Sequence, residues 1–356
     1  MDLVKDSLTS KIILKILLRS LLVFSTIISV GSSKRNLLMP SSSIIESINK
    51  ENNYSFDTSI LERITGIASR STSSEEEHPS TLAVEASMAA LNRAGLSASA
   101  IDTIIFASAS TDILTPATAN IVADNLSISP PCFDVSNACN SFMNGLHIAS
   151  LLVDSGSASL VLVCTGEVST KGMRYSFPDE TSFTKHFTGF TLGDGGAAVL
   201  VGRSETKSFE TFNSKSFPHF WRDSGIFAGG SRNLRKSDHG FFQGDPQKLK
   251  DNTKYVTDYY SSFILDDLKA KKMSIEDFRF VLTHQVTVKY RDLFYKQLGC
   301  TAEQTVPIVE IRGNITSASV PTQLDLVWDS IEKDDKILMA SVGGGMSAGY
   351  LIWTKK

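Results

Sequence analysis

Residues 133–142 read Phe133-Asp134-Val135-Ser136-Asn137-Ala138-Cys139-Asn140-Ser141-Phe142. A strand-like run ends here in small residues and one cysteine, and an apolar pattern with helical spacing follows at once. This order predicts a thiol at the junction between a strand and a buried helix. Unpaired N–H groups and the positive end of the helix dipole favour the thiolate there, which is the reactive form of cysteine. Cys139 is therefore a candidate nucleophile; the competing interpretation is a small buried apolar residue.

The composition is that of an ordinary soluble protein, with 356 residues, 42% hydrophobic and 21% charged. A net charge of −3 gives no reason to expect a nucleic-acid partner. The four cysteines form no CxxC pair and have no metal-ligand spacing, so we expect no metal site and no disulfide framework. Reduced cysteines favour a cytoplasmic protein.

The N-terminus has two interpretations. The apolar stretch 12–30, with Lys11, Lys15 and Arg19 at its front, resembles a signal peptide. A membrane span fits poorly, because the uncharged run 20–30 is shorter than the ~20 residues that a bilayer requires. We prefer a buried first strand over Leu21–Val30 in a parallel, doubly covered sheet, preceded by an extension over residues 1–17.

The rest of the chain alternates strand and helix patterns, which predicts an α/β fold with largely parallel strands. The pattern is read twice, over residues 18–205 and 206–356, as two related halves. Expected strands lie at 101–107, 132–135, 159–164, 197–201, 278–283, 306–310, 336–342 and 350–353. Expected helices lie at 41–50, 81–94, 117–126, 140–154, 251–271, 288–298 and 317–329.

Three further segments of the second half place chemical groups at the ends of expected strands. His284 follows the strand over 278–283, at the edge where α/β sheets bind ligands. Asn314 follows Gly313 after the strand expected over 306–310, although Gly-Asn is also an ordinary turn. Gly343-Gly344-Gly345 follows the strand over 336–342 and lets backbone N–H groups approach a substrate. Taken alone, His284 could equally be a structural histidine.

In this order, Asn137-Ala138-Cys139, His284-Gln285, residues 313–321 and Gly343-Gly344-Gly345 resemble β-ketoacyl-ACP synthase III and its relatives in the thiolase superfamily. The resemblance covers about residues 20–356. It implies a five-layered αβαβα thiolase-like fold with two duplicated halves, and a homodimer.

The resemblance also implies the chemistry. Cys139 attacks an acyl thioester and carries the acyl group, while N–H groups of Cys139 and Gly344 form the oxyanion hole. His284 and Asn314 stabilise the enolate that forms when a malonyl thioester loses carbon dioxide. The substrates are then acyl-CoA or acyl-ACP and a malonyl thioester, with no bound cofactor. Acyl transfer from Cys139 to an alcohol or amine, and a non-catalytic dimer partner, are the alternatives; the intact catalytic set argues against the second.

Two departures from the family pattern bear on the reaction. Long-chain and pyrone-forming relatives carry a glutamate base just before the proline that matches Pro116, on a loop that reaches the partner subunit. This chain has Thr115 there, in the expected substrate tunnel and dimer loop, and its nearest upstream carboxylate is Asp112. A non-decarboxylative, base-driven reaction is therefore disfavoured. Asn140 stands where relatives have a small or apolar residue, which predicts an atypical acyl pocket.

A carrier protein could dock on the helix after His284, where the family binds acidic carrier helices. Lys289, Arg291 and Lys296 would form this docking site. The alternative is an ordinary solvated helix face.

Overall fold

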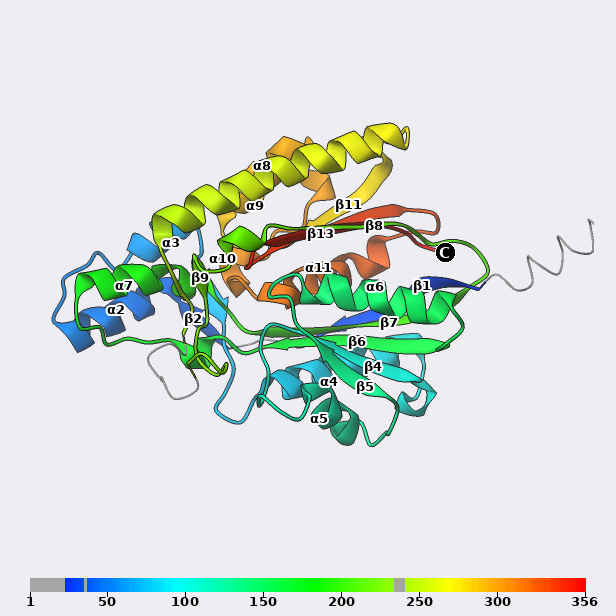
Figure 1. Cartoon of the computed structure of the whole chain (residues 1–356), viewed down its shortest axis with the longest axis horizontal. Coiled ribbons are helices and arrows are strands. Elements are labelled where there is room, and N and C mark those ends of the chain that lie inside the picture. The colour runs from blue at the N-terminus through cyan, green and yellow to red at the C-terminus, as the bar shows by residue number, and fades with distance from the viewer. Residues whose placement is uncertain (1–22, 35–36, 234–240) are drawn as a thin grey trace, which may run out of the picture.

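The structure is a computed structural model that describes residues 23–34, 37–233 and 241–356. The extension expected over residues 1–17 and the first two residues of the expected N-terminal strand lie outside these ranges. Figure 1 shows two sheets, one above the other, with helices between them and on both outer faces. These are the five layers of the expected thiolase-like αβαβα fold.

The first sheet belongs to the N-terminal part of the chain and has the strand order β1-β7-β6-β4-β5. Strand β4 is parallel to both β5 and β6, whereas β7 is antiparallel to β6 and to β1. Its strands are β1 (Phe24–Ser32), β4 (Thr103–Ala107), β5 (Cys132–Val135), β6 (Leu160–Glu167) and β7 (Gly195–Ser204).

The second sheet repeats this arrangement, with the order β11-β12-β13-β8. Strand β11 is parallel to β12, and β13 is antiparallel to β12 and β8. Strands β8, β13, β12 and β11 thus correspond in order and direction to β1, β7, β6 and β4. The division proposed after residue 205 stays a prediction; it falls between β7 and β8. The strands are β8 (Phe209–Ser216), β11 (Phe278–Thr283), β12 (Lys336–Gly343) and β13 (Ser347–Thr354).

Each face of the two sheets is covered by helices (Figure 1). The middle layer contains α6 (Ser141–Asp154) and α11 (Ser319–Val327). The outer layers contain α4 (Pro79–Ala94) with α5 (Thr118–Asn125), and α8 (Pro246–Ala270) with α9 (Val288–Leu298). Shorter elements gather at one end of the layers: α2 (Ser41–Asn52), α3 (Ile60–Thr65), α7 (Glu180–His186), α10 (Val309–Arg312), and the ribbons β2 (Leu38–Pro40) with β3 (Ser69–Ser71) and β9 (Ser224–Gly225) with β10 (Gln243–Gly244).

Three apolar clusters hold the layers together. The largest joins α6 and α11 to both sheets and includes Leu146, Val163 and Trp353. A second packs α8 and α9 on the second sheet, and a third packs α4 and α5 on the first. Burial of this apolar surface is the main stabilising contribution and fixes the sheets against each other.

Strand β1 partly corrects the expectation for the N-terminus. It is antiparallel to β7 and lies at the edge of its sheet, so the prediction of a parallel strand was wrong. The apolar run of β1 is nevertheless explained by its burial on both faces, because α4 packs on one face of the strand and α6 and α11 pack on the other. Close packing against α4 requires glycine at position 31, because a Cβ there would lie 2.5 Å from Ala86 O and Ala90 N.

The strand expected over Val306–Glu310 is absent, and the described part of the second sheet therefore has no counterpart of β5. Residues 305–308 have no regular structure, and α10 begins at Val309. The Gln285 side chain donates a hydrogen bond to Val306 O at 2.8 Å and accepts from Ile308 N at 3.0 Å. This amide satisfies the backbone groups that a neighbouring strand would otherwise have bonded.

Within the described ranges, no helix combines the length and the apolarity that crossing a bilayer requires.

Candidate active site

Cys139 lies in a tight turn between β5 and the first residue of α6, as predicted. The preceding residue, Ala138, has φ = 49°, in the left-handed region that non-glycine residues rarely adopt. Ser141 holds the turn, because its hydroxyl donates to Ala138 O at 2.6 Å and accepts from Asn137 N at 2.8 Å. The turn thereby presents the thiol at the N-terminus of a buried helix.

The glycine loop packs directly on this turn. A Cβ on Gly343 would lie 3.1 Å from Asn140 N and 3.3 Å from Cys139 N, so only glycine fits there without a shift. Ser341 of β12 donates a hydrogen bond to Cys139 O at 3.0 Å. Gly345 has φ = 120°, which requires glycine. The glycine loop of the second sheet therefore lies against Cys139, which follows a strand of the first sheet.

His284 stands directly after β11, at the predicted strand end. Its backbone N–H bonds Ala340 O at 2.9 Å, which ties it to β12. The side chain is buried, and among the described residues neither ring nitrogen makes a hydrogen bond of ordinary length. Burial lowers the pKa of His284 to about 4, although the nearby Thr316 backbone raises the pKa slightly, so the imidazole is neutral at physiological pH. A buried neutral imidazole has one N–H group and is well suited to donate it to a ligand oxygen.

Asn314 follows helix α10 rather than the expected strand, yet it still reaches the site. Its backbone is held between Thr191 O, to which it donates at 2.8 Å, and Gly193 N, which donates to its carbonyl at 3.0 Å. The side-chain Oδ1 accepts from Thr316 N at 3.0 Å. The amide orientation is thereby set, and the Nδ2 group is left to donate to a ligand.

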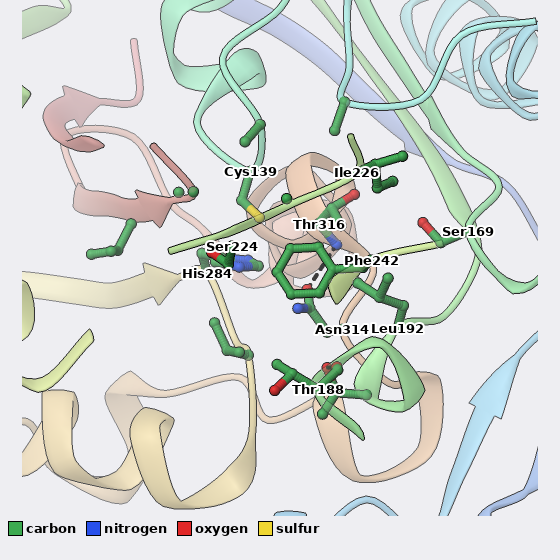
Figure 2. A pocket seen from close by; sticks show the side chains of 18 of the residues that line it. Cys139, Ser169, Thr188, Leu192, Ser224, Ile226, Phe242, His284, Asn314 and Thr316 are labelled. Carbon is green, nitrogen blue, oxygen red and sulfur yellow. Dashed lines mark hydrogen bonds between the residues drawn. The ribbon is translucent and has the colours of Figure 1, made fainter. Parts of the chain in front are cut away.

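Cys139, His284, Asn314 and Gly344 line one cavity of about 320 Å³. Figure 2 shows the Cys139, His284 and Asn314 side chains around this cavity, with the Phe242 ring across its front. The structure therefore brings together all four residues predicted for the centre of the site.

The ionisation of Cys139 differs from the expectation that its turn favours the thiolate. The pKa of the thiol is raised to about 12, mainly by burial and to a smaller extent by the negative charge of Glu167. The backbone N–H groups of Gly344 and of Cys139 lower the pKa, but not enough to offset burial. The unloaded residue is a neutral thiol. The two N–H groups that act on the sulfur are the pair expected to form the oxyanion hole.

Several lining residues escaped the sequence analysis because they follow no recognisable motif. They come from the β9–β10 ribbon and from the first turns of α8, and they make the cavity wall largely apolar. The residues of this wall are Ser224, Gly225, Ile226, Phe242, Leu249 and Thr253. Phe242 directly precedes a strand of only two residues, too short to give an alternating pattern that could be recognised in the sequence.

Asn140 does not line the cavity of the single chain, and the atypical acyl pocket expected from this residue stays a prediction. Its side chain is fully buried and lies against β13, where a Cβ on Gly349 would be 3.0 Å from its Oδ1. Thr115 is exposed and also lies outside the cavity of the single chain. Its place in a dimer tunnel stays a prediction.

The three residues predicted for carrier docking all lie on α9, but they are not equivalent. Lys289 and Lys296 are exposed. Arg291 is less accessible: its side chain is 10% exposed and pairs with Glu310 and with Asp292 at 2.8 Å. The guanidinium of Arg291 ties α9 to α10, and the role of this residue in carrier docking stays a prediction.

The described residues contain no group of three or more histidine, cysteine, aspartate or glutamate side chains that could hold a metal ion.

Comparison with known proteins agrees with this geometry. Residues 133–217 match the family model of 3-oxoacyl-[acyl-carrier-protein] synthase III, and residues 268–355 match the model of its C-terminal part. The β-ketoacyl-[acyl-carrier-protein] synthase III of Clostridium perfringens strain SM101 is 32% identical over 294 residues, which are 80% of this chain and 87% of the relative. The acyl-CoA:acyl-CoA alkyltransferase of Xanthomonas campestris is 28% identical over 313 residues, which are 83% of this chain and 88% of that protein.

Solved structures agree on the fold. A crystal structure of a variant of Xanthomonas campestris OleA superposes with a TM-score of 0.81 at 24% identity, covering 94% of this chain and 98% of that one. OleA with bound cerulenin gives the same TM-score, identity and coverage. The matched family models, the extent of the sequence similarity and the duplicated αβαβα layers together show that this chain belongs to the 3-oxoacyl-[acyl-carrier-protein] synthase III family of the thiolase superfamily.

Proposed function

We propose that this chain loads an acyl thioester on Cys139 and joins the acyl group to a malonyl-type thioester by decarboxylative Claisen condensation, in fatty-acid or polyketide-like biosynthesis. The observation that carries the proposal is the convergence of Cys139, His284 and Asn314 on one largely apolar cavity. Two N–H groups that act on the Cys139 sulfur support it.

In the loading step, the Cys139 sulfur attacks the thioester carbonyl. The N–H groups of Cys139 and Gly344 stabilise the oxyanion; such a donor contributes about 3–4 kcal/mol at the transition state. The carbon–sulfur bond of the donor then breaks, and the departing thiolate takes up the proton that the Cys139 thiol has lost. Because this thiol is neutral at rest, deprotonation accompanies the attack.

In the condensation step, the bond between the malonyl carbon and its carboxylate breaks, and carbon dioxide leaves. The electron pair passes to the thioester, whose oxygen accepts hydrogen bonds from neutral His284 and from Asn314 Nδ2. The enolate carbon then attacks the acyl group on Cys139. The bond between the acyl carbon and the Cys139 sulfur breaks, which gives the β-ketoacyl thioester, and the Cys139 thiolate takes up a proton from the solvent, which restores the thiol.

A non-decarboxylative reaction needs a base that the described site does not offer. Thr115 cannot act as a carboxylate base, and Asp112 is already engaged. Its carboxylate accepts from Ser80 N at 2.8 Å and from Ser80 Oγ at 2.6 Å, at the start of α4. Transfer of the acyl group from Cys139 to an alcohol or amine remains the competing outcome in the test below.

The proposal is tested by incubating the protein with acyl-CoA and acyl-ACP donors of several chain lengths and measuring the mass of the peptide that contains Cys139. We expect an acyl adduct that is discharged by malonyl thioester with release of carbon dioxide. Absence of an adduct with every donor contradicts both the condensing and the transfer reaction. An adduct that is discharged only by alcohols or amines supports acyl transfer.

The same assay tests the carrier-protein donor. Changing Lys289 and Lys296 together to glutamate should slow loading from acyl-ACP about tenfold, because the exposed ammonium groups would attract an acidic carrier, and should leave acyl-CoA loading unchanged. Lys333→Glu is the matched control: Lys333 is exposed and precedes β12 at the end opposite Gly343. Equal loading from acyl-ACP by the double variant and the wild type would exclude this docking face.

We also propose a homodimer that contains the exposed loop before Thr115. Ile113 and Leu114 are 47% and 72% exposed, and β5 is a free sheet edge in the single chain. Leu114→Asp should therefore shift the protein from dimer to monomer in light scattering coupled to size exclusion. A monomeric wild-type protein would contradict the proposal.

A further inference from the structure

Glu167, the last residue of β6, is a carboxylate with an unusual environment. Its side chain is fully buried, and no lysine or arginine of the described residues forms an ion pair with it. A buried carboxylate without a cation is costly unless hydrogen bonds stabilise it. It lies outside the cavity lining and takes no part in the reaction steps above.

Three donors from two parts of the chain converge on this carboxylate. Ala109 N and Ser110 N donate to its two oxygens at 2.9 and 3.0 Å. The third donor is the hydroxyl of Ser317, which comes from the second half. Ser317 also shares a hydrogen bond of 2.9 Å with Thr165 Oγ1 on β6. Glu167 therefore connects a segment of the first sheet's half with Ser317, next to residues that line the cavity.

The groups that Glu167 holds belong to the cavity wall. Ala109 and Ser110 line the cavity themselves. Ser317 follows Thr316, whose N–H orients the Asn314 amide and whose φ of 45° is unusual for a β-branched residue. Anchoring Ser317 therefore helps to keep the Asn314 turn in this conformation.

Glu167 also acts on the nucleophile through its charge. Its negative charge is the second cause, after burial, of the raised pKa of Cys139. In a buried site such an interaction is weakly screened.

We propose that Glu167 is a positioning residue, which holds the Ala109–Ser110 wall and the Asn314 turn around the cavity. Its negative charge adds to the effect of burial, which is the larger cause, in keeping the unloaded Cys139 a neutral thiol. This assignment rests on the proposed role of Cys139 as the acyl carrier. A neutral thiol is protected from oxidants and stray electrophiles until a thioester is bound in the oxyanion hole.

The test measures the alkylation of Cys139 by iodoacetamide, an uncharged reagent, between pH 6 and 9. In the wild type the rate should rise about tenfold per pH unit without a plateau, because the thiol pKa of about 12 lies above this range. Glu167→Gln removes the charge and keeps the shape. It should speed alkylation severalfold at every pH in this range, whereas Glu167→Asp, which keeps the charge, should stay near the wild type.

Asp194 provides a matched control. It is also a fully buried carboxylate held by backbone N–H groups and a hydroxyl, from Ser169, Thr170 and Ser73, but it does not act on the Cys139 pKa. Asp194→Asn should therefore leave the alkylation rate of Cys139 unchanged. If Cys139 of a folded Glu167→Gln protein is alkylated at the wild-type rate, or no faster than in Asp194→Asn, the claim that the Glu167 charge raises the pKa of Cys139 is overturned.

Ser317→Ala tests the positioning part and does not depend on the folding of the Glu167 variants. It removes the link to the Asn314 turn but keeps the charge. We expect acylation of Cys139 within about twofold of the wild type and condensation reduced about tenfold. Unchanged condensation overturns the positioning role. If no donor acylates Cys139, the proposed function fails, but the alkylation series still decides whether Glu167 controls the thiol.

Discussion

Cys139→Ala should abolish the acyl-enzyme and reduce product formation by at least about 10⁴-fold, because the reaction then lacks its covalent intermediate. The structure gives the reason for so large an effect. Cys139 is the only cysteine among the residues that line the described cavity, and the N–H groups of Gly344 and Cys139 act on its sulfur. No other described nucleophile is placed against these two donors.

The measurement is intact-mass spectrometry after incubation with an acyl thioester, followed by turnover with the malonyl thioester. Cys300→Ala is the control, because Cys300 is a free, partly buried thiol outside the cavity, after α9. This variant should acquire the adduct like the wild type. An adduct of equal yield on the Cys139→Ala protein would show that another group carries the acyl chain.

Asn314→Ala should reduce condensation about 10²- to 10³-fold while leaving the acylation of Cys139 within severalfold of the wild type. The enolate oxygen carries charge only in the second step, so a donor aimed at it contributes to that step alone. Asn314 Nδ2 is such a donor, since Thr316 N occupies the Oδ1 atom and sets the orientation of the amide.

Asn314→Asp separates the donor from the shape of the side chain. It keeps an oxygen that accepts from Thr316 N but replaces the Nδ2 donor with a second oxygen. We expect the same loss of condensation as in Asn314→Ala, measured as carbon dioxide released per acyl-enzyme. Wild-type condensation by Asn314→Asp, or equal loss of both steps in Asn314→Ala, would contradict the role proposed for this amide.

Much of the layered fold is predictable from local patterns. Strand β11 and helix α9 begin and end where the sequence predicts, because β-branched and aromatic runs and a terminal glycine determine their bounds locally. The strand expected over Val306–Glu310 was wrong for a non-local reason. The Gln285 amide, about twenty residues earlier in the chain, bonds the backbone that would have paired in a sheet.

The candidate site shows the same limit. Strand ends and glycines place Cys139, His284 and Gly344 without knowledge of packing, and the family resemblance adds Asn314. The ionisation of Cys139 depends instead on burial and on Glu167, which approaches from β6 and has no motif of its own. The pairing of Arg291 with Glu310 and the burial of Asn140 against β13 are likewise contacts between distant segments.

The central claim is that acyl-Cys139 is the species that condenses with decarboxylation. It is tested most directly by isolating the acyl-enzyme, adding one equivalent of malonyl thioester labelled in its free carboxyl group, and measuring labelled carbon dioxide and product in a single turnover. We expect one carbon dioxide and one β-ketoacyl thioester for each acyl group lost from Cys139. Loss of the acyl group without labelled carbon dioxide, or a product that retains the label, would contradict the claim.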